Sequence, residues 1–331
     1  MATFTSLTSS PYANWMDMKF EVGAIHQVIK TATQITVLST EPGSTALNRV
    51  DYFGKFTYAG NSVSGTLESF SRTTPEGQVR YTIKDLSLDA GSVSAFILSG
   101  TDAELIPIAL AGKDELVGNE WSFLLGYGGD DTYISQYMYF SVFDGGDGID
   151  TAVFNENRGS FNVKSNYGSL TERPELSVEK GWMGTSVNLK NVERIQFADT
   201  ALALDISGNA GQAYRLYRAA FDRTPDRDGL GFWISTLDNG ATLQSVAAGF
   251  VNSSEFKGLF SSNPTNKAVL TAFYKNVLHR EPDQSGYDFW LNALDKGLSI
   301  NQMLVDFSES AENKAQVIGS IQNGIEYHPY G

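Results

Sequence analysis

The chain has 331 residues and a net charge of −14, a length that suits two domains or three small ones. Its acidity argues against nucleic-acid binding, because a negative surface repels phosphate backbones. No run approaches the 18 apolar residues of a transmembrane helix, cysteine is absent, and residues 1–20 lack the basic start and apolar core of a signal peptide.

Residues 1–108 have the pattern of strands and turns. Residues 49–58 are rich in β-branched and aromatic side chains, and Val79, Tyr81 and Ile83 alternate with polar residues. We therefore expect a β-rich domain here, with no recognisable catalytic motif.

Residues 109–154 are rich in glycine and aspartate. Residues 145–153 fit the nonapeptide G-G-x-G-x-D-x-U-x, in which U is apolar, and residues 126–134 fit it except for Tyr127 at the second glycine. A third, eroded copy spans residues 111–116. The predicted calcium-site residues in these turns are Asp114, Gly126, Gly128, Gly129, Asp130, Asp131, Gly145, Gly146, Asp147, Gly148 and Asp150.

These residue types suit a calcium site. Glycine lets a turn adopt positive φ, and the aspartate at position six supplies a carboxylate. Calcium takes six to eight oxygen ligands, which two facing turns can provide. Asp114, Asp131 and Asp150 are 17 and 19 residues apart, near the 18 of a regular roll, so we expect a short, degenerate roll with about one or two ions. The alternative is that the turns bind no metal.

The nonapeptides resemble the RTX (hemolysin-type) calcium-binding repeats, and residues 187–199 resemble the segment that closes such rolls. Residues 154–205 would then form a β cap over the roll. The resemblance implies type I secretion in the unfolded state and calcium-driven folding outside the cell, which is consistent with the absence of cysteine and of a signal peptide.

From about residue 210 the apolar period becomes helical, and the sequence matches itself without gaps at an offset of 57 residues. Each copy is expected to form three helices. An Arg-x-Pro-Asp-x-x-Gly turn, with its aspartate as helix cap, separates the first two. The paired residues include Tyr217/Tyr274, Arg223/Arg280, Asp226/Asp283, Trp233/Trp290, Gly240/Gly297 and Glu255/Glu312.

This pattern resembles the DUF4214 family over residues 205–320, a domain common in exported bacterial proteins. The paired Arg and Asp residues could bind a ligand or stabilise the turn, and the stabilising role is expected. Trp233 and Trp290 could stack on sugars, although packing in the core is expected for both.

The sequence thus predicts a multidomain α+β protein: a β-rich domain (residues 1–108), a calcium-binding parallel β-roll with a β cap (109–205) and an all-α domain of two tandem repeats (206–331). The expected function is that of a secreted or cell-surface structural protein, such as a matrix, adhesin or surface-layer component. Its expected partners are calcium, the type I secretion machinery, and surface or matrix polysaccharide or a second copy of itself.

Two other functions stay open. One is a carbohydrate-binding module that uses Tyr52, Tyr58 and Tyr81, and the other is a small hydrolase acting on extracellular polysaccharide. No H-E-x-x-H, G-x-S-x-G or G-x-x-x-x-G-K-[ST] motif occurs, and His26, His279 and His328 are far apart in the sequence. We therefore expect no enzymatic activity.

Overall fold

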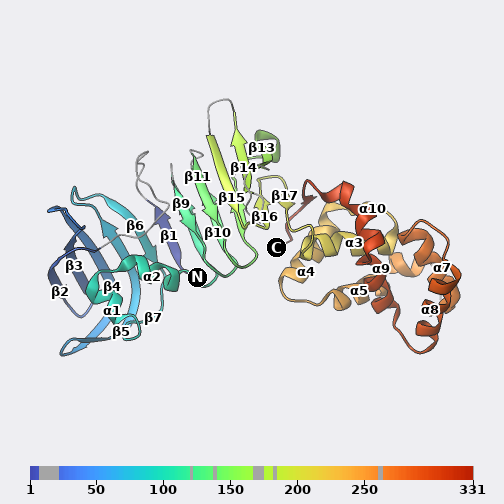
Figure 1. Ribbon diagram of the computed structural model, residues 1–331, viewed down its shortest axis with the longest axis horizontal. Helices are drawn as coiled ribbons and strands as arrows, with labels where there is room; N and C mark the ends of the chain where they lie inside the picture. The colour runs from blue at the N-terminus through green and yellow to red at the C-terminus, as the bar shows by residue number, and fades with distance from the viewer. Residues whose placement is uncertain are drawn as a thin grey trace. The chain divides into compact units, whose positions relative to one another are not determined.

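The computed structural model describes residues 1–6, 22–119, 122–136, 140–166, 175–181, 185–259 and 264–330. The chain divides into two compact units, Met1–Ala198 and Asp199–Gly331. Strands dominate the first unit and helices the second, as Figure 1 shows. The predicted combination of a β-rich N-terminal part and a helical C-terminal part is confirmed.

The first unit begins with a twisted antiparallel sheet in the order β1-β6-β5-β4-β3-β2, with β7 beside β5. The strands predicted over residues 49–58 and 79–84 correspond to β4 and β6. The bounds are β1 (Thr3–Ser6), β2 (Ile25–Lys30), β3 (Gln34–Thr40), β4 (Leu47–Ala59), β5 (Ser62–Thr73), β6 (Val79–Lys84) and β7 (Leu88–Asp89).

Two short helices, α1 (Ser94–Ser99) and α2 (Asp102–Ala109), follow this sheet, so the expectation of strands and turns throughout residues 1–108 is wrong for this segment. The buried residues Asp102, Leu105, Ile106 and Ala109 have helical spacing. The segment is short and contains Pro107, which obscures the helical pattern in the sequence.

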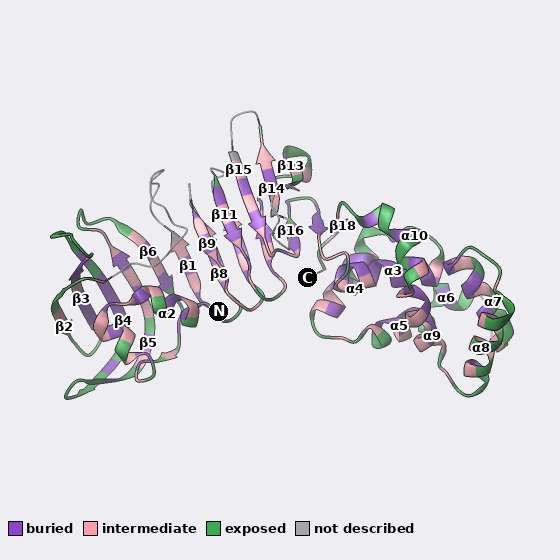
Figure 2. Cartoon of the chain, viewed as in Figure 1, coloured by how far each residue is buried: buried purple, intermediate pink, exposed green. Residues whose placement is uncertain are grey.

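A buried ion pair lies in the core between α2 and the sheet. Nη1 of Arg72 donates a 2.6 Å hydrogen bond to Oδ1 of Asp102, and the Tyr81 hydroxyl donates to Oδ2 of the same carboxylate. All three side chains are at most 1% exposed. Figure 2 shows buried residues along the centre of the strands of this antiparallel sheet.

The rest of the first unit is built from short parallel strands in two rows. The first row continues from β1 in the order β1-β8-β10-β12-β16, and the second has the order β9-β11-β15. Successive strands alternate between the rows over β8 to β12. The bounds are β8 (Glu115–Gly118), β9 (Phe123–Leu125), β10 (Thr132–Ser135), β11 (Ser141–Asp144), β12 (Thr151–Val153), β15 (Thr185–Lys190) and β16 (Arg194–Gln196).

The two rows enclose a thin apolar core. Tyr133 of β10 stacks on Phe143 of β11 with ring centroids 5.2 Å apart, while Leu116, Leu124 and Ala152 are at most 1% exposed. Strand β11 lies between the two Gly/Asp turns. Residues 137–139, which precede it, lie outside the described residues.

The second row is extended by a hairpin. Strand β14 (Glu175–Lys180) pairs antiparallel with both β15 and β13 (Asn162–Asn166). A short 3-10 helix, η1 (Arg158–Ser160), directly precedes β13. Phe154, Phe161 and Phe197 pack together where this part ends, with ring centroids 5.3–5.9 Å apart.

The second unit consists of helices and one small antiparallel pair, β17 (Ala201–Ala203) with β18 (Ile325–Tyr327). Its helices share one apolar core. Their bounds are α3 (Asn209–Phe221), α4 (Arg227–Asp238), α5 (Leu243–Asn252), α6 (Ser254–Leu259), α7 (Asn266–Val277), α8 (Gln284–Asp295), α9 (Ile300–Ser308) and α10 (Ala311–Ile321).

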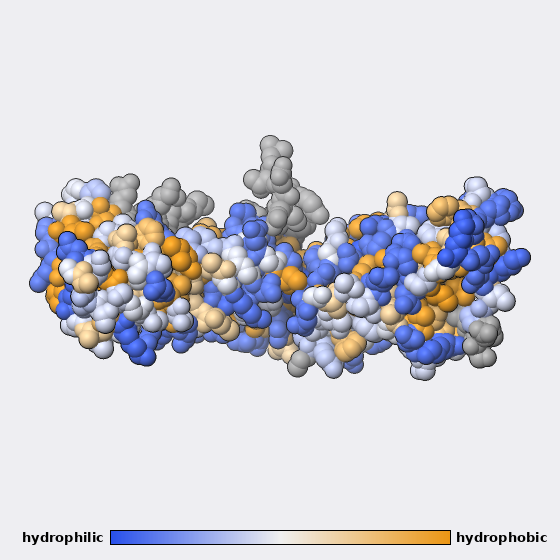
Figure 3. Space-filling view, turned by 90° about the horizontal axis from the view of Figure 1, so that it is seen from below, coloured by the Kyte–Doolittle hydropathy of each residue, from blue (hydrophilic) through white to orange (hydrophobic). Residues whose placement is uncertain are grey.

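None of the helices in the described ranges has both the length and the apolar character needed to cross a bilayer. Apolar side chains do reach the surface of the antiparallel part, at the left end of Figure 3. The exposed large apolar residues of this part include Ile25, Ile29, Leu47 and Phe53.

Candidate metal centre

The two Gly/Asp turns, residues 126–131 and 145–150, lie side by side because the strands that follow them pair in parallel. Thr132 of β10 is opposite Thr151 of β12 on one side and Glu115 of β8 on the other. Each strand begins directly after an aspartate. Three acids therefore occupy equivalent positions on adjacent turns, namely Asp114, Asp131 and Asp150.

The two turns have positive φ at the same two positions despite their different residues. Gly146 has φ 94°, and Tyr127, the residue that departs from the nonapeptide, has φ 67° at the equivalent position. Gly129 and Gly148 are also equivalent, with φ 106° and 139°. Tyr127 thus adopts a left-handed conformation that glycine reaches without strain.

The equivalent acids form a continuous hydrogen-bonded ladder, which we call the acid ladder. The backbone N–H of Asp114 donates to Oδ1 of Asp131 at 2.8 Å, and that of Asp131 donates to Oδ1 of Asp150 at 2.8 Å. At one end Ala2 donates to Asp114 at 2.5 Å, and at the other Asp150 donates to Oε2 of Glu193 at 2.9 Å. One oxygen of each side chain is therefore satisfied by the neighbouring turn.

The second oxygen of each aspartate in the ladder is buried and has no hydrogen-bond partner among the described residues. These atoms are Oδ2 of Asp114, Asp131 and Asp150. A Cβ on Gly126 would lie 2.2 Å from Oδ2 of Asp131 and 2.3 Å from the carbonyl oxygen of Gly145. On the next turn, a Cβ on Gly145 would lie 2.4 Å from Oδ2 of Asp150 and 2.3 Å from the carbonyl oxygen of Asn191. The absence of a side chain at these glycines lets a carboxylate and a carbonyl oxygen converge.

Burial makes these carboxylates difficult to ionise without a counter-charge. Removal from water raises the pKa of Asp131 to about 8, and the charges of Asp150 and Asp114 add to the increase. Burial likewise raises the pKa of Asp150 to about 7, with a contribution from Glu193, and raises the pKa of Asp114. The ladder therefore favours a bound proton or a cation.

Glu193 was not among the predicted site residues. The sequence carries a signal for it, because an acid followed by a short strand with an inward apolar residue, as in Glu193-Arg194-Ile195, repeats the pattern of Asp150-Thr151-Ala152. It was missed because 43 residues separate Glu193 from Asp150, far from the 18-residue period. Ala2 has no motif at all and joins the ladder only through the pairing of β1 with β8.

Two predicted acids, Asp130 and Asp147, are exposed and outside the ladder. Oδ1 of Asp130 accepts a 2.9 Å hydrogen bond from the N–H of Ile149 on the next turn. The carbonyl of Asp147 accepts one from the N–H of Gly129 at 2.8 Å, and Gly128 pairs with Asp147 in a parallel bridge. These residues hold the turns together.

The donor set fits a hard cation only if main-chain oxygens take part. Within the described ranges, no three Asp, Glu, His or Cys side chains form a group that could hold a metal ion. Calcium, however, commonly combines carboxylate with backbone carbonyl oxygens. The unpartnered Oδ2 atoms of Asp131 and Asp150, each close to a carbonyl oxygen, are compatible with such a site.

The paired Arg and Asp residues of the helical unit stabilise its turns. Nε of Arg223 donates to Glu255 at 2.8 Å, and Nε of Arg280 donates to Glu312 at 2.7 Å. The predicted helix caps are present, since the side chains of Asp226 and Asp283 accept the N–H groups of Gly229 and Gly286 at 2.7 and 2.9 Å. Gly240 and Gly297 follow α4 and α8 with φ 88° and 99°, as expected for helix ends.

The aromatic residues that recur at an offset of 57 residues in the helical unit serve packing. Trp233 stacks on Phe250 with ring centroids 4.6 Å apart, and Trp290 lies 5.2 Å from Phe307. In the first unit Tyr52 and Tyr81 are at most 1% exposed, so neither ring offers a face to a glycan. Tyr58 is 36% exposed, and its hydroxyl donates to the carbonyl of Thr31.

Comparison with known proteins gives a result for the helical unit alone. No curated protein matches the chain. Residues 208–260 and 247–317 each match the family described as "Domain of unknown function (DUF4214)". The matches begin at the N-cap of α3 and end within α10. The helical C-terminal part of this chain is thus similar to the DUF4214 family over residues 208–317.

Proposed function

We propose that residues 109–198 form a short RTX-type β-roll that binds calcium, and that the protein is a secreted structural or interaction component of the cell surface or extracellular matrix. The observation that carries the proposal is the register of Asp114, Asp131 and Asp150. Each has one buried carboxylate oxygen that has no hydrogen-bond partner in the part of the chain that the structure describes.

Electrostatics support a cation at these turns. Adjacent strands of a sheet lie about 4.8 Å apart, so ionised acids at equivalent positions repel one another. In the part of the chain that the structure describes, Asp131 and Asp150 accept or donate backbone hydrogen bonds, but no ion pair compensates their charge. A divalent cation would offset this repulsion and stabilise only the folded state, in which the turns lie side by side.

Asp131 and Asp150 would hold the ion, together with carbonyl oxygens of the turns such as those of Gly145 and Asn191. Gly126 and Gly145 would keep this space free of side chains. The ion would supply charge compensation, and the chain's own contribution is to fix the oxygens through the acid ladder.

The helical unit would provide the interaction surface. Its recurring Arg–Glu pairs, Arg223–Glu255 and Arg280–Glu312, support two tandem repeats of one structural unit. We propose that these repeats contact surface polysaccharide or a second copy of the chain, with calcium acting as the signal that the protein has reached the outside of the cell.

Calorimetric titration of the chelator-treated full chain with calcium tests this proposal. We expect saturable binding by the wild type and its loss in Asp150→Asn, because this variant retains the oxygen that accepts from Asp131 and removes only the charge. Magnesium is a suitable specificity control and should bind much more weakly, since it prefers its own water shell to a mixed carbonyl site. Absence of calcium binding by the folded wild type would overturn the metal assignment.

A further inference from the structure

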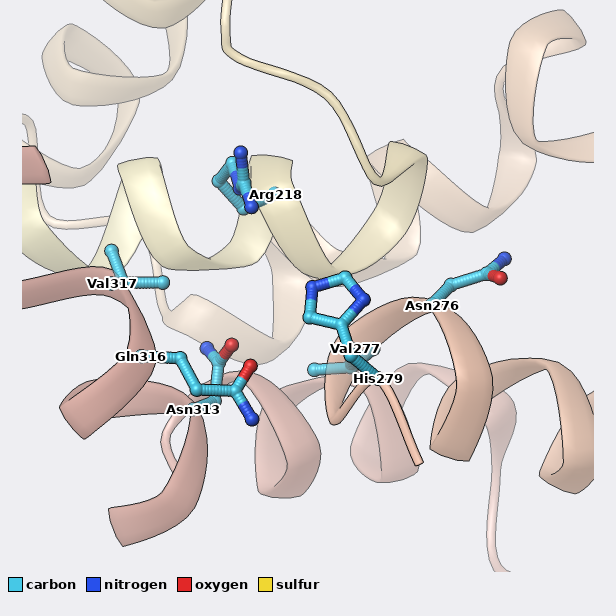
Figure 4. Close-up of a pocket in the computed structure, with 7 residues that line it drawn as sticks. All are labelled: Arg218, Asn276, Val277, His279, Asn313, Gln316 and Val317. Atoms are coloured by element: carbon cyan, nitrogen blue, oxygen red, sulfur yellow. The ribbon is translucent and has the colours of Figure 1, made fainter. Parts of the chain in front are cut away.

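A cavity of about 300 Å³ in the helical unit is unrelated to the Gly/Asp turns. It lies among α3, α7 and α10, and Figure 4 shows the side chains around it. Arg218 comes from α3, His279 follows α7, and Asn313 and Gln316 come from α10. The volume is near the lower end of the range for small-molecule sites.

Arg218 provides a positive charge at this cavity. In the part of the chain that the structure describes, its guanidinium makes no hydrogen bond or ion pair with another residue. Most other arginines of the unit are engaged, as with Arg215 on Glu309 and Arg223 on Glu255. A half-buried guanidinium in a chain of net charge −14 is a natural partner for an anion.

The neighbouring amides are suited to neutral hydrogen-bonding groups. Nδ2 of Asn313 donates to the carbonyl of Ser308 at 2.7 Å, and Nε2 of Gln316 donates to that of Leu278 at 3.1 Å. These bonds fix both side chains and leave their amide oxygens as acceptors. Asn276 adds a third amide to the lining.

The polar lining is specific to the second half of the helical unit. At the offset of 57 residues, the positions of Asn276, Asn313 and Gln316 correspond to Ala219, Phe256 and Leu259. The packing of the helices does not require amides at these positions, because the first half of the unit has apolar residues at the equivalent positions. The substitution of three apolar positions by amides around one cavity favours ligand binding.

His279 lies at the same cavity in a strained conformation. Its φ is 50°, in the left-handed region, and Nε2 is 3.9 Å from Oδ1 of Asp222. Asp222 is a negative charge near the cavity, and α3 and α7 also end here. One guanidinium carries a full charge, whereas a helix end carries about half of one. The site therefore suits a single negative charge better than a dianion.

We propose that this cavity binds a small hydroxylated carboxylate, such as a hexuronate. Arg218 would pair with the carboxylate through parallel N–H donors, a geometry that a guanidinium matches well. The amide oxygens of Asn313 and Gln316 would accept from hydroxyl groups. Val277 and Val317 form an apolar part of the cavity wall, against which the C–H face of a sugar could pack.

Calorimetry or ligand-observed NMR on the full chain tests the proposal with glucuronate, glucose and sulfate as probes. We expect saturable glucuronate binding and at least ten-fold weaker binding of glucose and sulfate. Arg218→Gln and Asn276→Asp should each weaken glucuronate binding at least ten-fold, the second by adding a negative charge. Lys275→Gln is the matched control, since it removes an exposed charge one residue from the lining.

Each result decides for or against the site. Loss of glucuronate binding in both variants, with the control unchanged and circular dichroism preserved in all three, supports it. Equal binding of glucose, equal binding of sulfate, unchanged affinity in Arg218→Gln, or no glucuronate binding by the wild type would overturn it.

Discussion

Asp131 and Asp150 are joined by a 2.8 Å hydrogen bond from the backbone N–H of the first to Oδ1 of the second. The bond holds two adjacent turns together, and Oδ2 of Asp150 is buried without a hydrogen-bond partner in the described ranges. The same relationship links Asp114 to Asp131. Each carboxylate thus has two distinct roles, one oxygen binding the chain and the other remaining for a proton or a cation.

Replacing the buried charge by an amide should stabilise the metal-free protein. In chelator at pH 8 we expect Asp131→Asn to raise the melting temperature by several degrees, because the amide keeps the acceptor oxygen without the cost of a buried charge. Calorimetric melting measures the shift. Asp147→Asn, on an exposed residue of the neighbouring turn, should leave the melting temperature unchanged; a lowered value for Asp131→Asn would speak against the account.

The metal-free protein should lose stability as the pH rises. The folded-state pKa values of Asp131 and Asp150, about 8 and about 7, exceed the unfolded value of about 3.9, so the folded state binds more protons in this interval. The resulting stabilisation is complete below pH 4 and disappears as the pH passes 7 to 8. Urea unfolding at pH 5 and pH 8 in chelator tests this, and Asp131→Asn with Asp150→Asn should flatten the difference.

The glycines of the turns should tolerate no side chain where oxygens converge. Gly145→Ala would place Cβ 2.3 Å from the carbonyl oxygen of Asn191, and we expect a loss of at least about 2 kcal/mol in unfolding free energy. Gly112→Ala is the control in the eroded turn, where a Cβ meets nothing within 4 Å. Equal stabilities of the two variants by urea denaturation would be inconsistent with close packing of the turns.

The ion pairs of the helical unit should contribute to the unfolding free energy according to how deeply they are buried. Arg215 and Glu309, at 4% and 19% exposure, form a two-pronged pair at 2.7 and 2.9 Å, and Glu309→Ala should cost about 3 kcal/mol. The pair of Arg280 and Glu312 is more exposed, at 40% and 39%. Glu312→Ala should therefore lower the unfolding free energy by less than about 1 kcal/mol. Chemical denaturation of both variants compares them, and a larger loss for Glu312→Ala would refute this ranking.

The sequence predicts local features of this protein better than its long-range pairings. Asp226 as a helix cap and Gly240 as a helix end follow from local chemistry, and both are present in the structure. The insertion of β1 beside β8 depends on an interaction between residues 112 positions apart, for which one sequence carries no signal. Glu193 also belongs to the ladder, but 43 residues separate it from Asp150, so the spacing of about 18 residues does not predict it.

Calcium binding by the acid ladder is tested most directly by thermal melting of the full chain in chelator and in millimolar calcium at pH 8. We expect calcium to raise the melting temperature of the wild type, with no comparable increase in Asp131→Asn with Asp150→Asn. Glu104→Gln with Glu281→Gln removes the same number of charges from exposed positions and should respond like the wild type. A calcium shift that persists in the ladder variant, or no shift in the wild type, would contradict the account.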